Sequence, residues 1–446
     1  MSFPRYPEYK DSGVEWLGEV PSHWEISRIK QLFEICKRIA GTEGFDVLSI
    51  TQSGIQVKDT ESGGGQLSMD YSKYQLVEIG DFAMNHMDLL TGYVDVSKTI
   101  GVTSPDYRVF RLRNAAACSR YFLYLFQNAY KRKIFFPFGQ GSSLLGRWRL
   151  PTDEFNAFNI PLPPSAEQTR IAAFLDRETA KIDALVAEQQ SLIALLKEKR
   201  QALISHAVTK GLDPDVPMKD SGVAWLGEVP AHWTLTKLKY STSHIIDCPH
   251  ETPTYCPDGD YLVVRTADVD AGALDLSNAY RLDEVEYLKR TRRAKLVPQD
   301  IVYGREGERW GYAATVPDEP VLCLGQRMMQ FRARAGIAPR FLMWQLNSDV
   351  TYRQGQVDTV GATSPHVNVS TIANYVLTEP PFSEQVEIAN YVDGATSEID
   401  DLVSEARATV ELLQERRTAL ISAAVTGKID VRHLAVATAD PTPEPA

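Results

Sequence analysis

The sequence contains one long helical pattern twice, and this duplication limits the folds open to the chain. Residues 163–211 begin Pro-Pro-Ser-Ala-Glu-Gln, and after Pro164 neither proline nor glycine occurs until Gly211. Residues 380–427 match this stretch without gaps at an offset of 217 (380 − 163). A helix from residue 171 to residue 208 would be about 57 Å long at 1.5 Å per residue. It is too long, and its apolar stripe too narrow, for an ordinary core helix.

The apolar spacing in this stretch predicts a coiled coil. Ser165 lies three residues before Gln168, which is the pattern of a capping box at a helix start. Apolar residues then follow at alternating steps of three and four, with Gln189 and Lys199 at the two polar places of the seam: Ile182, Leu185, Leu192, Leu196 and Leu203. The second copy has the same stripe. Burying each helix against the other predicts an antiparallel pair with a pseudo-two-fold axis and the modules at its opposite ends.

A second duplication precedes each helix. Residues 10–24, Lys-Asp-Ser-Gly-Val-Glu-Trp-Leu-Gly-Glu-Val-Pro-Ser-His-Trp, return with two changes as residues 219–233. The chain is therefore predicted to be two tandem α+β modules, each followed by a long helix. The expected boundaries are a module at 1–162, a helix at 163–211, a module at 212–379, a helix at 380–431 and a disordered tail at 432–446. Within the first module we expect a helix over 26–39, a helix over 119–130, and strands over 47–51, 74–77, 82–85 and 107–112.

The overall composition is that of a soluble protein of the reducing cytoplasm. The net charge is −11, and the five cysteines are irregularly spaced. The first residues contain no apolar stretch of the kind that opens a secretory signal. The acidic total by itself argues against nucleic-acid binding, but an average can conceal a basic surface.

One segment of the first module is strongly basic. Residues 103–150 hold nine basic residues against the single acid Asp106, a local charge of +8. Such a segment suits a phosphate backbone, or it is a solvated face balanced by acids elsewhere in the fold. Its glycine- and serine-rich part, 139–149, ends in Arg-Trp-Arg and favours the first interpretation. The candidate DNA-contacting residues here are Lys131, Arg132, Lys133, Ser142, Ser143, Arg147 and Arg149.

The second module presents different side chains at a corresponding place. Residues 300–311 are typical of a strand that runs into a glycine-bounded loop presenting Arg305 and Arg309. The matching stretch of the first module, 81–92, carries other candidates, and a polar loop closes the second module. The remaining candidate DNA-contacting residues are Asn85, His86, His366 and Asn368. One scaffold with different loop tips is expected where loops set specificity.

The sequence predicts no catalytic, cofactor or metal site in this chain. It has no Walker A sequence and no nucleophile elbow, and the Glu-Pro-Pro-Phe at 379–382 departs from an adenine-methyltransferase motif at its first position. Four candidate zinc ligands lie within thirteen positions, but their spacing fits none of the usual patterns and favours loop residues and a buried thiol: His244, Cys248, His250 and Cys256.

The chain resembles the specificity (S) subunits of type I restriction-modification systems over essentially its whole length. The features that carry the resemblance are the paired segments at 10–24 and 219–233, the Pro-Pro-x-x-Glu-Gln openings of both helices, their Ala-Leu-Ile-Ser ends at 202–205 and 419–422, and Asp-Cys-Pro-His-Glu-Thr-Pro at 247–253. The resemblance implies two target-recognition domains on an antiparallel coiled coil. Each domain would bind one half of a split, asymmetric site in double-stranded DNA.

The resemblance also implies partners and cofactors. The partners would be two modification (M) subunits, which methylate adenine with S-adenosylmethionine, and restriction (R) subunits, which use ATP and Mg. It supplies no base-contacting residues, so the candidates above rest on loop position and chemistry. The alternative is a coiled-coil scaffold whose two modules bind non-DNA ligands, and the +8 segment argues against it.

Overall fold

The protein is described by a computed structural model covering residues 3–59, 70–141, 148–307, 309–357 and 366–434. The chain divides into two compact units. Unit 1 is Met1–Gln189 with Ala408–Ala446, and unit 2 is Gln190–Arg407. Each unit therefore contains one globular body and a part of both long helices.

Unit 1 is built on a four-stranded antiparallel sheet. The strand order is β4-β11-β8-β9, with β4 at Phe33–Cys36, β11 at Arg108–Leu112, β8 at Phe82–Met84 and β9 at Val94–Val96. Around it lie four two-stranded pairs: β1 (Tyr9–Asp11) with β2 (Glu19–Pro21), β3 (Glu25–Arg28) with β12 (Asn159–Leu162), β5 (Leu48–Thr51) with β6 (Gly54–Val57), and β7 (Gln75–Val77) with β10 (Gly101–Thr103). The helical elements are α1 (Ile29–Leu32), α2 (Ser119–Lys131), the 3₁₀ turn η1 (Phe136–Phe138) and α3 (Thr152–Ala157).

The core of unit 1 is largely aromatic. Phe33, Phe82 and Phe110 from three neighbouring strands meet Phe126 of α2, with ring centroids 5.2–5.9 Å apart in mostly edge-on contacts. Aromatic side chains on the pleated face of a sheet bury much apolar area, and edge-on pairs add further attraction. The sequence Tyr-Phe-Leu-Tyr-Leu-Phe of 121–126 is entirely buried, which fixes α2 against this sheet.

Unit 2 repeats this sheet and adds a second one. The order is β16-β24-β21-β22, with β16 at Thr242–Asp247, β24 at Met328–Ala333, β21 at Ile301–Gly304 and β22 at Ala313–Thr315. The additional sheet is β20 (Tyr280–Leu282), β17 (Tyr261–Val264) and β23 (Leu322–Leu324); the pairs are β13 (Met218–Asp220) with β14 (Glu228–Pro230), β15 (Thr234–Lys237) with β25 (Val376–Glu379), and β18 (Val269–Asp270) with β19 (Ala273–Leu274). Its helical elements are α5 (Leu238–Ser241), η2 (Thr266–Asp268), α6 (Glu284–Arg290), α7 (Pro339–Leu346), α8 (Asp349–Gln356) and α9 (Val369–Ala373).

The two four-stranded sheets have the same register as well as the same order. In unit 1 Phe110 lies opposite Phe82 and Ile35, and in unit 2 Phe331 lies opposite Ile301 and Ile245. This correspondence assigns an equivalent in unit 2 to each residue of the sheet in unit 1. The duplication seen in the sequence is therefore a duplication of the sheet itself, although the strands between the repeated segments differ in sequence.

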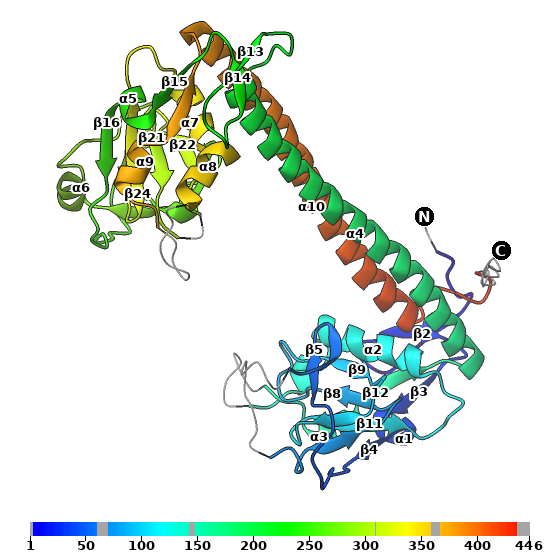
Figure 1. Ribbon diagram of the computed structural model, residues 1–446. Coiled ribbons are helices and arrows are strands. Elements are labelled where there is room, and N and C mark those ends of the chain that lie inside the picture. The colour runs from blue at the N-terminus through cyan, green and yellow to red at the C-terminus, as the bar shows by residue number, and fades with distance from the viewer. Residues whose placement is uncertain (1–2, 60–69, 142–147, 308, 358–365, 435–446) are drawn as a thin grey trace. The chain divides into compact units, whose positions relative to one another are not determined.

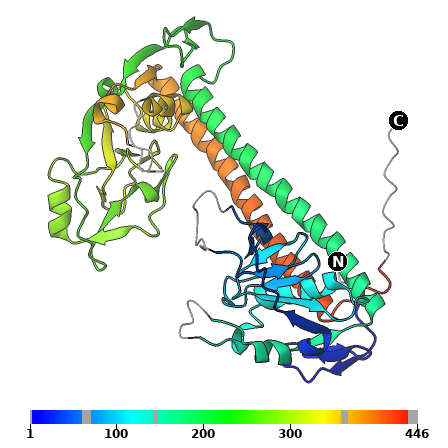
Figure 2. The ribbon, with the colours of Figure 1, turned by 60° about the horizontal axis from the view of Figure 1, so that its bottom comes forward.

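The two long helices, α4 (Ser165–Lys210) and α10 (Phe382–Val425), lie side by side and antiparallel, as predicted (Figure 1, Figure 2). In unit 1 Arg417 Nε lies 2.9 Å from Asp183 Oδ1, and in unit 2 Arg200 Nε lies 2.9 Å from Asp400 Oδ1. The two ion pairs are equivalent, since each residue of one is 217 positions from its counterpart in the other. The repeat therefore forms the same ion pair between the two helices once in each unit.

The predicted seam is wrong at every second position. Leu185 and Leu192 are 44% and 43% exposed, and Lys199 is exposed as well. The less exposed residues of α4 follow steps of four and then three instead: Ile182, Val186, Gln189, Ile193, Leu196, Arg200 and Leu203. Steps of four-three and three-four are both compatible with a 3.5-residue period, and Leu185 stands next to the equally apolar Val186.

The repeated segments at 10–24 and 219–233 anchor the starts of the helices. Trp24 and Trp233 are both fully buried, and their indole nitrogens donate to Glu167 (3.1 Å) and Glu384 (2.9 Å). Both glutamates lie in the first turn of a long helix, where a negative charge is favoured by the helix dipole. Trp24 and Trp233 are therefore structural anchors of the two helix starts.

Most predicted elements of unit 1 are present. The four predicted strands correspond to β5, β7, β8 and β11, and the predicted helix 119–130 corresponds to α2. The helix predicted over 26–39 is wrong, because this stretch forms β3, the single turn α1 and β4. In the described part of the chain, no helix combines the length and apolar character of a bilayer span.

Candidate nucleic-acid interface

In each unit, the loop after the central strand pairs with the segment that returns to the last short helix. In unit 1, Leu150 N donates to His86 O at 2.9 Å; in unit 2, Val367 N donates to Arg305 O at 3.3 Å. Leu150 and Val367 are 217 positions apart, the same offset that relates the long helices. His86 and Arg305 are thus equivalent, and so are the residues before the donors, Arg149 and His366. Four of the predicted residues fall on one edge of the repeated scaffold.

The loop of unit 1 is held by Asn85. Its carbonyl accepts from Tyr130 Oη at 2.8 Å, and its side-chain Oδ1 accepts from Met87 N at 3.3 Å. The next residue, His86, is partly buried, and its Nδ1 has no hydrogen-bond partner among the described residues. Burial, together with the positive charges of Arg108 and Arg149, lowers the pKa of His86 to about 3. The imidazole is therefore neutral at pH 7 and can both donate and accept.

The remaining candidates of unit 1 lie away from this edge. Lys131 and Lys133 line a hollow of about 670 Å³ with Asp183 and Arg417 of the long helices. Burial and the Arg417 charge lower the pKa of Lys131. Arg132 donates to Ser422 Oγ of α10, so this side chain is tied to a long helix and is not free in solvent.

Part of the predicted site lies outside the described residues. The candidates at these positions are Ser142, Ser143 and Arg147. Neighbouring Arg149 is described and exposed, and its backbone pairs with Gln140.

The basic segment 103–150 is partly balanced by acids from elsewhere in unit 1. Arg111 Nε lies 2.5 Å from Glu34 Oε1, and Arg120 Nε lies 2.7 Å from Asp176 Oδ1. The explanation of a charge balanced by acids elsewhere in the fold therefore holds for Arg111 and Arg120. Some of its arginines are structural, whereas Arg149 stays exposed.

The structure corrects the expectation that the loop of unit 2 presents Arg305. Arg305 is only 8% exposed; its Nη2 lies 2.6 Å from Glu306 Oε1, and its Nε lies 3.6 Å from Asp247 Oδ1. A guanidinium between two carboxylates supports its neighbours more readily than it contacts a ligand, because leaving the ion pairs would leave two partly buried acids unpaired.

Other predicted residues of unit 2 do reach the surface. The Arg309 side chain is 47% exposed, and its Nη1 lies 3.0 Å from Asp270 Oδ1. Asn368 is exposed at the residue before α9, and His366 bridges to Glu306 through the backbone. Arg309, His366 and Asn368 therefore come from the two segments that meet at this edge.

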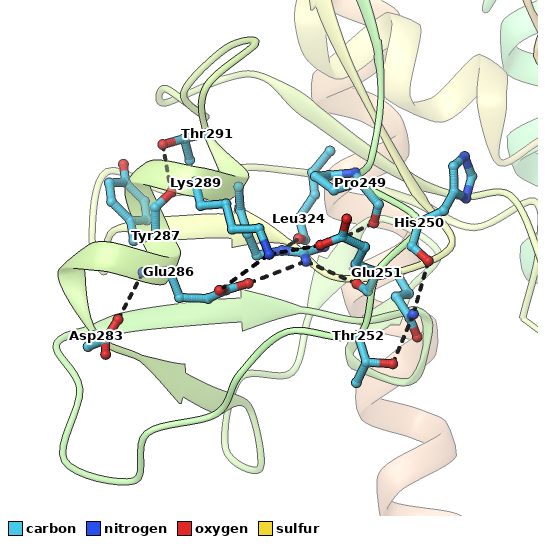
Figure 3. A network of polar contacts seen from close by, with 12 residues as sticks. Pro249, His250, Glu251, Thr252, Asp283, Glu286, Tyr287, Lys289, Thr291 and Leu324 are labelled. Carbon is cyan, nitrogen blue, oxygen red and sulfur yellow. Dashed lines mark hydrogen bonds and ion pairs between the residues drawn. The ribbon is translucent and has the colours of Figure 1, made fainter.

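Sequence reasoning missed one surface of unit 2, the loop 247–253. Arg290 holds the backbone of this loop through the carbonyls of Glu251 (3.1 Å) and Pro249 (3.3 Å). Figure 3 shows how the loop sits beside α6, with Lys289 Nζ 2.8 Å from Glu251 Oε2. The exposed His250 then lies 2.9 Å from Asp247, the acid next to Arg305. In the sequence this loop is marked by the Asp-Cys-Pro-His-Glu-Thr-Pro motif, whose residues are not among the predicted DNA-contacting residues.

The chain is similar in sequence to several known proteins. Residues 21–193 match the profile of a family described as type I restriction modification DNA specificity domain. The chain is 21% identical over 435 residues to the putative type I restriction enzyme MjaX specificity subunit of Methanocaldococcus jannaschii, covering 93% of this chain and 96% of that protein. It is 24% identical to the MjaVIII specificity subunit of the same organism, over 63% of this chain and 64% of that subunit. It is 23% identical to the EcoKI specificity subunit of Escherichia coli, over 62% of this chain and 58% of that subunit.

Solved structures agree in fold. A chain from a structure on complex assembly and conformational transition of the type I R-M system superposes with a TM-score of 0.66 at 15% identity, covering 91% of this chain and 98% of that one. The HsdS subunit of Thermoanaerobacter tengcongensis gives a TM-score of 0.51 at 15% identity, covering 92% and 98%.

The fold defines a class, that of two repeated α+β units carried on two long antiparallel helices. Residues 21–193 match the family of type I restriction-modification DNA specificity domains, and the protein is similar over almost its whole length to the specificity subunits of such systems.

Proposed function

We propose that this chain is the non-catalytic subunit that gives a type I restriction-modification enzyme its DNA sequence specificity. Each unit contacts one half of a bipartite, asymmetric target in double-stranded DNA. The observation that carries the proposal is the duplicated edge: one backbone arrangement places His86 and Arg149 in unit 1 at positions equivalent to those of Arg305 and His366 in unit 2. A scaffold that is repeated while its tips differ suits the recognition of two different sequences.

The exposed side chains at this edge have the chemistry that base recognition requires. Arginine pairs with the two acceptors of guanine, asparagine pairs with adenine, and both also contact phosphates. In unit 2, Arg309 and Asn368 are exposed, and the acid paired with Arg309, Asp270, is itself exposed. Among the described residues no cluster of three metal-binding side chains occurs. The proposal requires only binding from this chain.

The long helices support the proposal of two methyltransferase partners. Unit 1 exposes Leu185 (44%) and Leu412 (65%), and unit 2 exposes the equivalent Leu402 (50%) and Leu195 (60%). Each pair of equivalents is 217 positions apart. Leucines that stay exposed at repeated positions suit two copies of one partner, because one surface is then available twice. We infer that two M subunits dock here.

The finer assignments follow from this assembly. The M subunits would bring S-adenosylmethionine, and R subunits would bring ATP and Mg to the complete enzyme in the cytoplasm. The paired helices would set the number of base pairs between the two halves of the target, since their length is fixed by continuous hydrogen bonding.

Methylation mapping tests the proposal. A host without endogenous adenine methylation receives the methyltransferase proposed to assemble with this chain, with or without the chain itself. Its genome is then sequenced for N6-methyladenine. A split motif methylated only when the chain is present is the expected result. If an assembled complex yields the same methylation as the methyltransferase alone, the chain does not confer specificity.

A further inference from the structure

A hollow of about 420 Å³ opens at the edge of the central sheet of unit 1, beside the His86 loop. Its charged side chains are the cations Lys37, Arg108 and Arg149 and the single acid Asp106, and His86 and Tyr107 are its neutral titratable groups. Lys37 and Arg149 are exposed and come from segments on either side of the hollow.

Arg108, in the floor of this hollow, is a buried charge without a counter-ion. Its residue is 3% exposed, and its Nη2 donates to Leu150 O at 3.0 Å and to Thr152 Oγ1 at 3.3 Å. The guanidinium carbon lies 4.4 Å from the centre of the Phe155 ring. Among the described residues no carboxylate pairs with it, and its Nη1 has no hydrogen-bond partner.

This arrangement is costly in the free protein. Burial lowers the pKa of Arg108 to about 10, in the direction expected for a cation that lacks a compensating charge. His86 repeats the pattern, with an unpartnered Nδ1 and a pKa lowered by burial and by the charges of Arg108 and Arg149. A positive field that only the exposed Asp106 opposes therefore surrounds the hollow, and a bound anion would relieve it.

The equivalent place in unit 2 shows that the scaffold does not require this charge. By strand register, Arg108 corresponds to Met329, which is fully buried, and Lys37 corresponds to Asp247. His86 corresponds to Arg305, whose charge is matched by Asp247 at 3.6 Å and Glu306 at 2.6 Å. Unit 2 thus neutralises itself where unit 1 leaves positive charge unmatched.

We propose that the hollow of unit 1 binds a phosphate group of the DNA backbone, with Lys37 and Arg149 in contact and Arg108 supplying charge from below. The inference rests on the proposed function and assigns it a contact that only one half of the target would have. A phosphate fits because its oxygens accept hydrogen bonds and carry negative charge, which is what a lining of donors and cations lacks.

The test measures DNA affinity against salt for the complex of the full chain with its methyltransferase. The probe is a duplex containing the target found by methylation mapping, at 50–200 mM salt. Lys37→Gln and Arg149→Gln should each reduce the slope of log K against log salt by about one and weaken binding at 50 mM several-fold, with the target sequence unchanged. Arg108→Met, which installs the residue of unit 2, should weaken binding in the same direction.

Controls separate the possible outcomes. Lys30→Gln alters an exposed cation of unit 1 outside the hollow and should leave the slope unchanged. Phosphate ethylation interference should lose one sensitive position, in one half-site, in the Arg149→Gln complex. Unchanged slopes in both exposed variants, with wild-type binding intact, would overturn this inference alone. A changed base preference would replace the phosphate contact with a base contact, and absence of specific wild-type binding would remove the proposed function as well.

Discussion

At the scale of single residues, His86 and Arg305 occupy equivalent positions but are stabilised differently, His86 as a neutral imidazole and Arg305 by two carboxylates. Both were recognised as loop residues after a central strand, and both lie there. The burial of Arg305 could not be predicted, because one of its two acids, Asp247, lies 58 positions away in sequence and is brought near only by sheet pairing. Local patterns place a side chain on a loop, but tertiary contacts decide whether it is free.

The buried imidazole of His86 leads to a prediction about acid stability. Its pKa is about 3 in the folded protein, while an unfolded histidine titrates near 6.5. The unfolded chain therefore takes up a proton that the folded one refuses, and stability present above pH 6.5 is lost as the pH falls toward 3. We expect unit 1 to lose about 3 kcal/mol of unfolding free energy from this group between pH 6.5 and pH 4.

Urea denaturation of wild type and His86→Gln at pH 7, 5.5 and 4 measures this loss. The variant should show a flatter dependence on pH, whereas His206→Gln, an exposed position on α4, should follow wild type. Parallel curves for His86→Gln and wild type would show that His86 is not the group responsible.

At the scale of elements, the duplication identified the paired helices and their antiparallel arrangement without any structural information. The sequence does not determine which residues face the partner helix, because Leu185 and Val186 are adjacent apolar residues and either fits the heptad pattern. Packing decides in favour of Val186 and leaves Leu185 44% exposed. The helix predicted over 26–39 is wrong for a different reason. Strand pairing of β3 with β12, and of β4 with β11, overrides the weak helical periodicity of this stretch.

The exposed leucines predict how partner subunits are counted. Replacing Leu185 and Leu412 by serine in unit 1 should reduce the bound methyltransferases from two to one, and adding Leu195→Ser and Leu402→Ser in unit 2 should remove both. Each buried leucine contributes about 1.5–3 kcal/mol to association, so a double replacement weakens docking by at least a hundredfold. Thermal stability should change little, because these side chains are exposed in the free chain.

Native mass spectrometry of the co-expressed subunits gives the stoichiometry directly. Glu198→Ser with Glu415→Ser replaces exposed polar side chains at equivalent positions on the same helices and serves as the matched control. Two methyltransferases retained on the quadruple leucine variant would place the docking surface elsewhere.

At the scale of the whole molecule, a chain of net charge −11 is compatible with DNA binding because its charge is unevenly distributed. Arg111 and Arg120 are paired with acids, whereas Lys37, Arg108 and Arg149 surround a hollow in one unit only. The two units share a scaffold and differ at its edge. Recognition of one half of the target by one unit should therefore be separable from recognition of the other half.

Genome-wide mapping of N6-methyladenine tests that claim most directly, in a host that carries the methyltransferase with the Arg309→Ala chain. Arg309 lies at the edge of unit 2, and its side chain is 47% exposed. We expect a motif in which one half is relaxed or weakened while the other half and the spacer are identical to wild type. Equal loss of sequence preference in both halves, with the complex still assembled, would contradict it.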